Sequence, residues 1–400
     1  MAAAAEDWAG LPHDLLVLIA KHVKLMEDFI AFSGVCTSWR TASTKDNFDM
    51  LYPQLPLLML PDKDDDYREF YSLSKGKVSR RLYLPEAKGR ECFPSDQMGW
   101  LLTQSLDGKE VSLLNPFSRT QIQLPNQFAL SEEEEKEEEK EYRYIRNAIL
   151  SANPSFTSDY VLVIAYNTDV NHLAFWRPGD INWTEFEIVY RIGGVSNMIY
   201  YKSRFYLVSW SAEIGIIDVQ DGPEPRVESR LIYLNDNRDL FSQGDVQYYL
   251  VEVNDALLLV VRFGRKRPNI EDGLDTFKCE VYELDAIEGK LKEINDLGDS
   301  TIFLGLNGAT SIDSTKFTGV KPNHIYFTDD WFEENYFLEC GGGTDTGAYN
   351  LEDGSIESFY PGLSLSRPCP PTWGYTIIMI MRSYGVLYIQ YGPICETTFS

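Results

Sequence analysis

The chain changes character near residue 50, and this break limits its fold more than any other feature. Residues 8–50 follow a helical spacing of apolar positions, whereas nearly everything after Leu55 consists of short β-rich runs separated by turn residues. The longest apolar runs are strand-sized, well below the roughly 18 residues of a membrane-spanning helix. The sequence therefore predicts a mainly β fold with a small α-helical N-terminal module, and we expect no membrane association.

The β region contains a weak internal repeat of outgoing strands. Neighbouring repeats are separated by 42 to 67 residues, by subtraction of their positions. The shorter separations match the roughly 40 to 50 residues of a four-stranded propeller blade, and the longer ones require inserted loops. We predict a β-propeller of about six blades, with an irregular pair of β-sandwiches as the structural alternative. The repeats are anchored on Tyr71, Leu114, Phe175, Ile217, Tyr282 and Tyr349.

Two insertions and a closing strand are predicted in this region. The run EEEEKEEEKE within residues 131–142 is a low-complexity acidic segment, which indicates a solvated or disordered loop between blades. A second insertion is predicted at 265–273. The last β-rich runs, 374–381 and 385–391, are expected to close the ring against residues 55–60, because closure hides the sheet edges of an open array.

The charge balance disfavours nucleic acid as a partner. Lys and Arg number 36 against 61 Asp and Glu, which gives a formal net charge of −25. A phosphate backbone is repelled by such a chain unless a basic patch is segregated on its surface. The basic cluster at 265–267 is too short to form one, so we expect no nucleic-acid partner.

Motifs for catalysis or metal binding are absent from the sequence. The six cysteines include no C-x-x-C pair, and the four histidines lack the paired spacing of metal ligands. There is no G-x-S-x-G elbow and no phosphate-binding loop. We predict no catalytic residues, no metal and no cofactor, with the cysteines as reduced, buried thiols.

An acidic and aromatic cluster at residues 329–334 has two interpretations. Asp329, Asp330, Glu333 and Glu334 flank an aromatic pair, which is compatible with a sugar or cation site. The favoured interpretation is a hairpin turn whose acidic side chains face solvent and whose aromatic side chains are buried.

The helical module carries LPxDLL and VCxxWR at a specific spacing. Pro12 suits the opening turn of a helix, and Asp28 is predicted to cap a second one. The stretch from Leu11 to Ser43 closely resembles an F-box. The residues that this resemblance assigns to adaptor binding are Leu11, Pro12, Asp14, Leu15, Leu16, Ile19, Val23, Phe32, Val35, Cys36 and Trp39.

By resemblance, an F-box is a three-helix unit whose apolar face docks on a Skp-type adaptor, which bridges it to cullin and RING subunits. The apolar residues of the first helix are expected to divide between the module's own core and the adaptor groove. Trp39 is expected in the core, with Val35 and Cys36 near the contact. A helical unit of about 40 residues is small for a self-sufficient core, so we expect its apolar face to be buried against a partner or against the neighbouring β domain.

The β region resembles the kelch-like β-propeller domain of plant F-box proteins. SLLNPFSRTQIQLP, at residues 112–125, is similar to an element that recurs in that group, a hydrophobic residue before NP-x-(S/T) and a later LP. The predicted organisation is a disordered N-terminus at 1–7, an F-box at 8–50 and a propeller-like substrate-binding domain at 51–400.

The resemblance implies the substrate-recognition subunit of an SCF-type E3 ubiquitin ligase, a non-catalytic receptor with an unknown target protein. Two alternatives remain: an interaction protein that binds the adaptor without recruiting a substrate, and a propeller enzyme with a helical N-terminus. The first residues lack the basic region and long apolar stretch of a secretory signal. We therefore expect the protein in the cytoplasm, the nucleus or both.

Overall fold

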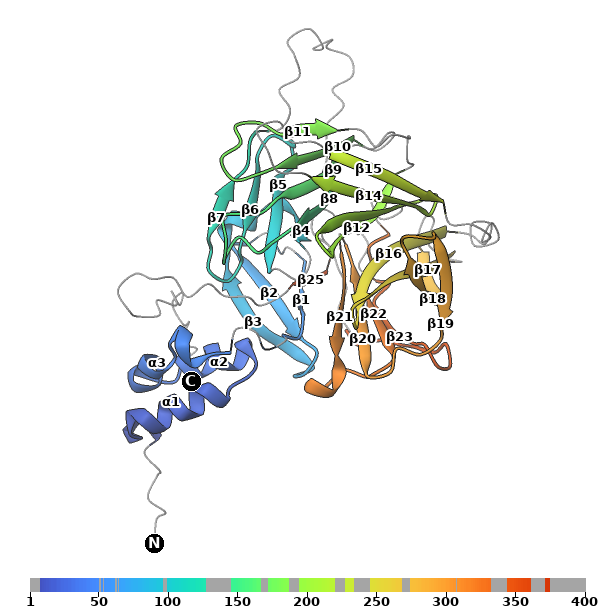
Figure 1. Ribbon diagram of the computed structural model, residues 1–400. Helices are drawn as coiled ribbons and strands as arrows, with labels where there is room; N and C mark the ends of the chain where they lie inside the picture. Colours follow the sequence, from blue (N-terminus) through green and yellow to red (C-terminus); the bar gives the residue numbers. More distant parts are fainter. Residues whose placement is uncertain are drawn as a thin grey trace.

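In the computed structural model, a small helical unit lies beside a ring of six β-sheets (Figure 1). The described residues are 8–49, 52, 54–61, 63, 65–95, 99–126, 145–166, 172–186, 194–219, 227–233, 245–267, 274–306, 308–331, 344–360 and 371–374, with only the backbone described at 227–233. The predicted disordered N-terminus and acidic loop lie outside these residues.

Three helices form the N-terminal unit: α1 (His13–His22), α2 (Met26–Ser33) and α3 (Thr37–Ala42). The predicted cap at Asp28 is wrong. The carbonyl of Leu25 accepts hydrogen bonds from the N–H groups of Asp28 and Phe29 at 3.1 and 2.9 Å, so α2 begins earlier. The helices share one core, formed by Leu16, Ala20, Met26, Phe29, Ile30, Phe32, Ala42 and Phe48.

Each of the six sheets is one propeller blade, which confirms the predicted fold class. Blade 1 holds β25 (Thr372–Gly374), β1 (Leu57–Met59), β2 (Tyr67–Ser72) and β3 (Lys77–Tyr83). Blade 2 holds β4 (Arg90–Ser95), β5 (Trp100–Ser105), β6 (Val111–Leu114) and β7 (Gln121–Gln123). Blade 3 holds β8 (Ile145–Leu150), β9 (Leu162–Tyr166), β10 (His172–Trp176) and β11 (Thr184–Phe186).

Blade 4 holds β12 (Val195–Tyr201), β13 (Arg204–Ser209), β14 (Glu213–Val219) and β15 (Val227–Tyr233). Blade 5 holds β16 (Asp245–Val253), β17 (Ala256–Lys266), β18 (Leu274–Asp285) and β19 (Lys290–Ile294). Blade 6 holds β21 (Gly308–Asp313), β20 (Ser300–Gly305), β22 (His324–Phe327), β23 (Gly347–Asn350) and β24 (Ile356–Glu357). The first strand named in each blade lies nearest the axis, and the last lies at the rim (Figure 1).

The six repeat anchors fall in six different blades. In blades 1 to 5 the anchor lies in the third strand from the axis, as with Leu114 in β6 and Ile217 in β14. In blade 6 the anchor Tyr349 lies in the fourth strand, β23, because β21 folds back along the inner edge of β20. As a result β20 pairs with β22 in parallel, whereas β22 pairs with β23 antiparallel.

The ring closes where β25 pairs with β1, with Leu58 opposite Trp373. The predicted partner segment, residues 55–60, is therefore confirmed, but the described closing strand is 372–374 and begins before the predicted run. Residues 375–391, which complete the predicted closing strands, lie outside the described part. The predicted insertion at 265–273 is partly wrong, since Arg265 and Lys266 extend β17 and pair with β18.

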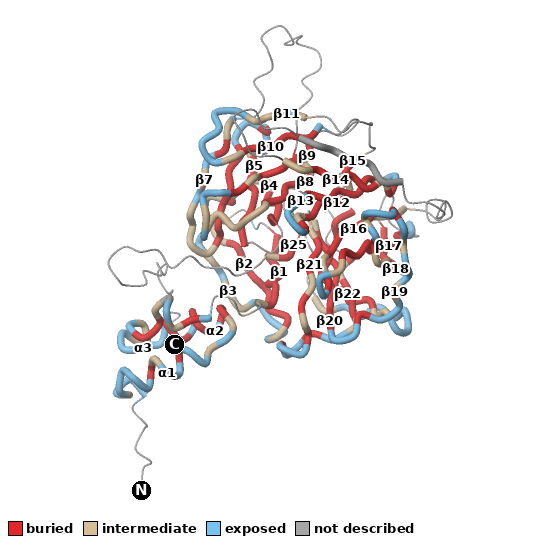
Figure 2. The backbone as a smooth tube through the Cα atoms, in the orientation of Figure 1, coloured by how far each residue is buried: buried red, intermediate tan, exposed pale blue. Residues whose placement is uncertain are grey.

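Burial follows distance from the axis (Figure 2). The inner and middle strands are mostly buried, whereas the rim strands β3, β7, β19 and β24 are largely exposed. Side chains also link neighbouring inner strands: Ser196 Oγ donates to the carbonyl of Tyr248 at 2.9 Å, and Asn197 Oδ1 accepts from the N–H of Leu250 at 2.9 Å. These bonds satisfy backbone groups between blades 4 and 5, where no strand ladder runs.

Candidate functional site

The N-terminal helical unit exposes large apolar side chains on its first helix. Leu15, Leu18 and Ile19 of α1 are 48%, 53% and 37% exposed. Their spacing of three and four residues places them on one face of the helix. Val35, in the link between α2 and α3, is 55% exposed. We call Leu15, Leu18 and Ile19 the apolar face of α1; it is available for burial against a partner.

The residues predicted for adaptor binding divide into exposed and inward-facing groups. Pro12, Asp14, Leu15, Ile19 and Val35 are exposed, and Cys36 is half-buried. Leu16 and Phe32 are buried in the core of the module, where Leu11, Val23 and Trp39 pack against them. Of the predicted set, only the exposed and half-buried residues are open to a partner without rearrangement of the module, and adaptor contact by any of them stays a prediction.

Trp39 occupies the inner position expected of it. Its ring packs on Phe32 with centroids 4.5 Å apart, and its Nε1–H donates to the carbonyl of Trp8 at 2.9 Å. This bond holds the short 3₁₀ turn Trp8–Gly10 against α3. Trp39 contributes to the shape of the module rather than to its exposed face.

Helix α2 attaches the F-box to blade 1, beside the β2–β3 hairpin (Figure 1). The buried carboxylate of Glu27 accepts hydrogen bonds from the hydroxyls of Ser72 and Ser74, at 3.3 and 3.4 Å. Arg80 of β3 donates to the backbone carbonyl of Glu27 at 2.5 Å. Gln54 bridges the linker to the same helix by accepting from the N–H of Met26 at 2.8 Å.

Lys75 adds charge to this junction. Its ammonium lies 3.1 Å from Glu27 and 2.9 Å from Asp28. Partial burial works to lower the pKa of Lys75, but the hydrogen bonds to Asp28 and Glu27 outweigh it and raise the pKa above its ordinary value. The charged form of Lys75 is thus favoured at the contact.

A cavity of about 180 Å³ opens where the inner strands of blades 3, 4 and 5 begin. We call it the axial cavity. Its walls come from the inner strands of several blades and from the segments that follow β13, β20 and β22. They include Arg146, Trp210, Asp245, Asp330 and Trp331. Aromatic, cationic and anionic groups therefore converge at one end of the propeller axis.

Trp210 forms an aromatic wall of the axial cavity. Its side chain is 44% exposed. Its backbone is fixed by a hydrogen bond from its N–H to the carbonyl of Gly194 at 2.8 Å. The indole ring lies directly on that glycine: a Cβ at residue 194 would lie 2.4 Å from the ring. Only glycine leaves room for this packing, so the backbone of Gly194 fixes the exposed ring.

The charges around the axial cavity are unequally compensated. Burial raises the pKa of Glu91 to about 7, against the opposing effect of the Arg146 charge, so Arg146 interacts with a neighbouring acid. Asp330 is paired with Arg262. Asp245, the first residue of β16, is half-buried, and its carboxylate has no hydrogen-bond or ion-pair partner among the described residues.

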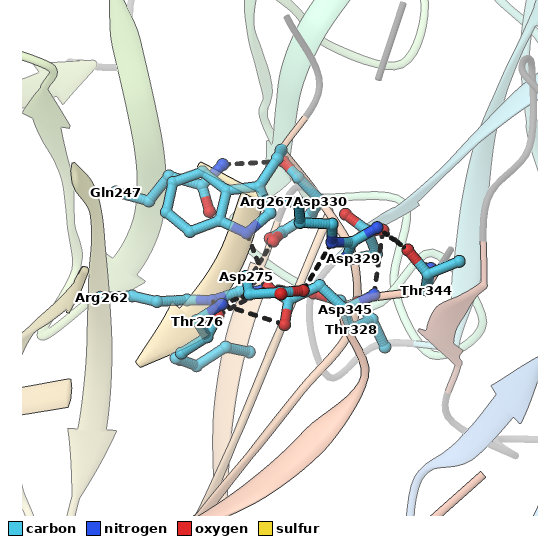
Figure 3. A network of polar contacts seen from close by, with 12 residues as sticks. Gln247, Arg262, Arg267, Asp275, Thr276, Thr328, Asp329, Asp330, Thr344 and Asp345 are labelled. Carbon is cyan, nitrogen blue, oxygen red and sulfur yellow. Dashed lines mark hydrogen bonds and ion pairs between the residues drawn. The ribbon is translucent and has the colours of Figure 1, made fainter. Parts of the chain in front are cut away.

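A buried network behind the axial cavity centres on Arg262 of β17 (Figure 3). The guanidinium donates to Asp330, to Asp345 at 2.7 Å and to Thr276 at 2.6 Å. It also lies 4.9 Å from the ring centroid of Trp331, whose Nε1–H donates to Asp345 at 2.7 Å. Burial raises the pKa of Asp330, although the charge of Arg262 opposes this shift.

This network corrects the expectation of solvent-facing acids for Asp329 and Asp330, whereas Glu333 and Glu334 lie outside the described residues. Asp329 and Asp330 are 2% and 6% exposed, and the Asp329 carboxylate accepts from the N–H groups of Thr344 and Asp345 at 2.8 and 3.1 Å. The expected burial of Trp331 is confirmed. Asp330 is buried against Arg262 of the neighbouring blade, and Asp329 is held by backbone N–H groups. The sequence offers no local sign of either contact.

The predicted burial of the cysteine thiols is confirmed for two of the three described cysteines. Cys92 and Cys279 are buried and free of disulfides, and burial raises the pKa of Cys279 to about 12. Cys36 is half-buried rather than buried, and the other three cysteines lie outside the described residues. In the part of the chain that the structure describes, no group of three or more His, Cys, Asp or Glu is placed to hold a metal ion, and no helix is long and apolar enough to cross a membrane.

Sequence reasoning missed Leu18, Trp210 and Asp245. Leu18 follows Leu15 by three positions, and that helical spacing is a signal for a shared face. Trp210 and Asp245 belong to different blades, and only the closed ring brings them to one cavity. No local pattern marks such a pair.

Two family models match the chain. The F-box domain model matches residues 8–51, and the model described as the KIB1-4 beta-propeller matches residues 70–350. Relatives from Arabidopsis thaliana align over most of their length. "Probable F-box protein At4g22060" is 25% identical over 385 residues, which cover 88% of this chain and 91% of that protein.

Two further Arabidopsis thaliana relatives match over similar lengths. "F-box protein SKIP23" is 24% identical, with 88% of this chain and 91% of the relative covered. "F-box/kelch-repeat protein At1g57790" is 23% identical, with 88% of this chain and 90% of the relative covered. The propeller model spans more than half of the chain, and the six-bladed ring and the F-box helices agree with both models. The protein therefore belongs to the plant F-box proteins that carry a KIB1-4 β-propeller.

Proposed function

We propose that the protein is the substrate-recognition subunit of an SCF-type E3 ubiquitin ligase. In this proposal the F-box binds a Skp-type adaptor, which links it to cullin and RING subunits, and the propeller holds a target protein. The chain itself is non-catalytic, since transfer of ubiquitin takes place on the other subunits.

The exposed apolar face of α1 carries this proposal. Leu15, Leu18 and Ile19 project from a unit whose own core is already filled by residues such as Leu16 and Phe29. Apolar side chains held this way are stabilised by burial in a partner, and their arrangement at helical spacing suits a helix-in-groove contact.

The rigid junction of α2 with blade 1 supports the receptor role. Glu27, Lys75 and Arg80 join the two parts by several polar contacts. A target on the propeller is then held at a defined distance and direction from the adaptor. Such positioning favours transfer to lysines within reach of the ligase.

Ubiquitin-remnant proteomics in plant cells tests the proposal. Cells that lack the protein are complemented with the intact chain, with a Leu15→Asp/Leu18→Asp variant or with Ile287→Asp, which alters an 80% exposed apolar residue on the propeller. We expect a set of ubiquitinated peptides to require the intact chain and to persist with Ile287→Asp but not with the α1 variant. An unchanged ubiquitinated proteome in all three lines, with equal protein levels, favours an adaptor-binding protein that recruits no substrate.

A further inference from the structure

The axial cavity is the right size for one side chain. At about 180 Å³ it is smaller than the roughly 300 to 1,000 Å³ of sites for drug-sized ligands and cofactors. It lies at the end of the propeller axis where the inner strands β8, β12 and β16 begin. A projecting side chain of a bound protein therefore matches its volume better than a small-molecule ligand does.

The aromatic wall is preorganised. The Trp210 ring is seated on the backbone of Gly194, and 44% of the side chain remains exposed beside the cavity. A large aromatic surface that is held in place and left uncovered is typical of an energetically important contact in a protein interface. Its face carries partial negative charge and attracts cations.

The uncompensated carboxylate lies in the same cavity. Asp245 opens β16, and its side chain has no partner among the described residues, whereas Asp330 is neutralised by Arg262. The one cation in the described lining, Arg146, interacts with the charge of Glu91. Among the charged side chains of the described lining, the carboxylate of Asp245 is the one left without a partner.

We propose that the axial cavity receives a lysine or arginine side chain of the target protein, with its stem against Trp210 and its charge on Asp245. This inference rests on the proposed receptor function and adds a contact site and a chemical class of ligand to it. Cation–π attraction and a charge-assisted hydrogen bond act together on a cationic side chain, and an uncharged side chain of the same length gains neither.

The experiment monitors Trp210 directly in the full chain. The protein is labelled with 5-fluorotryptophan, and the Trp210 signal in the fluorine NMR spectrum is assigned by its loss in Trp210→Phe. The probes are acetylated tripeptide amides with a central lysine, arginine, norleucine or glutamate between glycines. We expect a saturable shift of the Trp210 signal with the lysine or the arginine probe, and none with the norleucine or glutamate probe.

A matched pair of variants separates the cavity from general surface charge. Asp245→Asn is expected to weaken binding of the cationic probe roughly tenfold. Asp159→Asn removes an exposed carboxylate in the β8–β9 connection, at the far end of blade 3, and is expected to leave the affinity unchanged. Circular dichroism of each variant verifies the fold.

Three results overturn the inference: equal shifts with norleucine, a shift with glutamate alone, or unchanged affinity in Asp245→Asn. The same preparations are tested for capture of a Skp-type adaptor, which depends on the F-box. Normal adaptor capture without cation binding refutes the cavity assignment and leaves the proposed function standing. Cation binding without adaptor capture refutes the proposed function instead.

Discussion

The buried carboxylate of Glu27 in the F-box lies 3.1 Å from the ammonium of Lys75 in the first propeller blade. Glu27 is 7% exposed, and the hydroxyls of Ser72 and Ser74 also donate to it. A charge held in this way is costly to bury unless its partners remain in place. The pair therefore couples the position of the F-box to the propeller.

Glu27→Ala is expected to lower the free energy of unfolding by about 1 to 3 kcal/mol, because the donors of Ser72, Ser74 and Lys75 lose their shared acceptor. Denaturant titration measures the loss. Small-angle X-ray scattering is expected to show a wider range of F-box positions. The matched control is Glu288→Ala, which breaks an exposed pair with Lys290 and should change the stability by less than about 1 kcal/mol. Equal effects of both substitutions contradict the coupling.

Alanine substitutions at Leu16 and Leu18, two positions apart on α1, are expected to have opposite effects on stability and adaptor binding. Leu16 is fully buried, so Leu16→Ala is expected to destabilise the F-box by about 2 to 5 kcal/mol. Leu18 is 53% exposed, so Leu18→Ala should leave the stability within about 0.5 kcal/mol and weaken adaptor binding instead. Thermal unfolding and adaptor affinity are measured for both variants. A large loss of stability in Leu18→Ala would place that side chain inside the module.

Removal of Arg262 leaves two buried acids, Asp330 and Asp345, without their cation. Arg262→Ala is expected to lower the free energy of unfolding by about 3 to 5 kcal/mol at neutral pH. The loss should shrink on acidification, because burial raises the pKa of Asp330 and its carboxylate then takes up a proton. Lys292→Ala, which removes an exposed pair with Glu283, is the control and should have little effect at any pH. A pH-independent loss in Arg262→Ala would contradict this account.

The raised pKa of Glu91 predicts that part of the free energy of unfolding depends on pH. Burial raises its pKa to about 7 from 4.5, with Arg146 acting in the opposite direction. Between pH 4.5 and about pH 7 the folded state binds more protons at Glu91 than the unfolded state does. The stability that Glu91 contributes is therefore present at low pH and is lost as the pH rises through about 7.

Glu91→Gln should remove this component. The stability of the variant relative to the natural chain is expected to rise by up to roughly 3 kcal/mol between pH 4.5 and pH 8. Glu110→Gln, at an exposed acid in the same blade, provides the comparison and should give a flat difference. Denaturant titrations across this range supply the data, and a flat difference for Glu91→Gln would refute the raised pKa.

Local patterns were sufficient to predict the blades. The anchors, from Tyr71 to Tyr349, mark one strand in each blade because a short apolar run followed by turn residues recurs wherever a sheet packs between two others. Asn254 and Asp255 have φ of 49° and 64°, which suits the tight hairpin that they form between β16 and β17. The helical spacing of α1 predicted its apolar residues but not which of them face inward.

Contacts between blades could not be predicted in this way. Arg262 and Asp345 are 83 positions apart, and Trp210 and Asp245 meet at one cavity only after the ring has closed. Their pairing depends on how the blades pack side by side, which no window of neighbouring residues records. The same reason explains the wrong orientation predicted for Asp329 and Asp330.

Reciprocal capture with a plant Skp-type adaptor tests the central claim most directly. The intact chain, the Leu15→Asp/Leu18→Asp variant and the Ile287→Asp control are purified, verified by circular dichroism and titrated with the adaptor. We predict binding by the intact chain and by Ile287→Asp, and loss of binding by the α1 variant. Absence of binding by a well-folded intact chain, or equal binding by all three proteins, would contradict the ligase-receptor account.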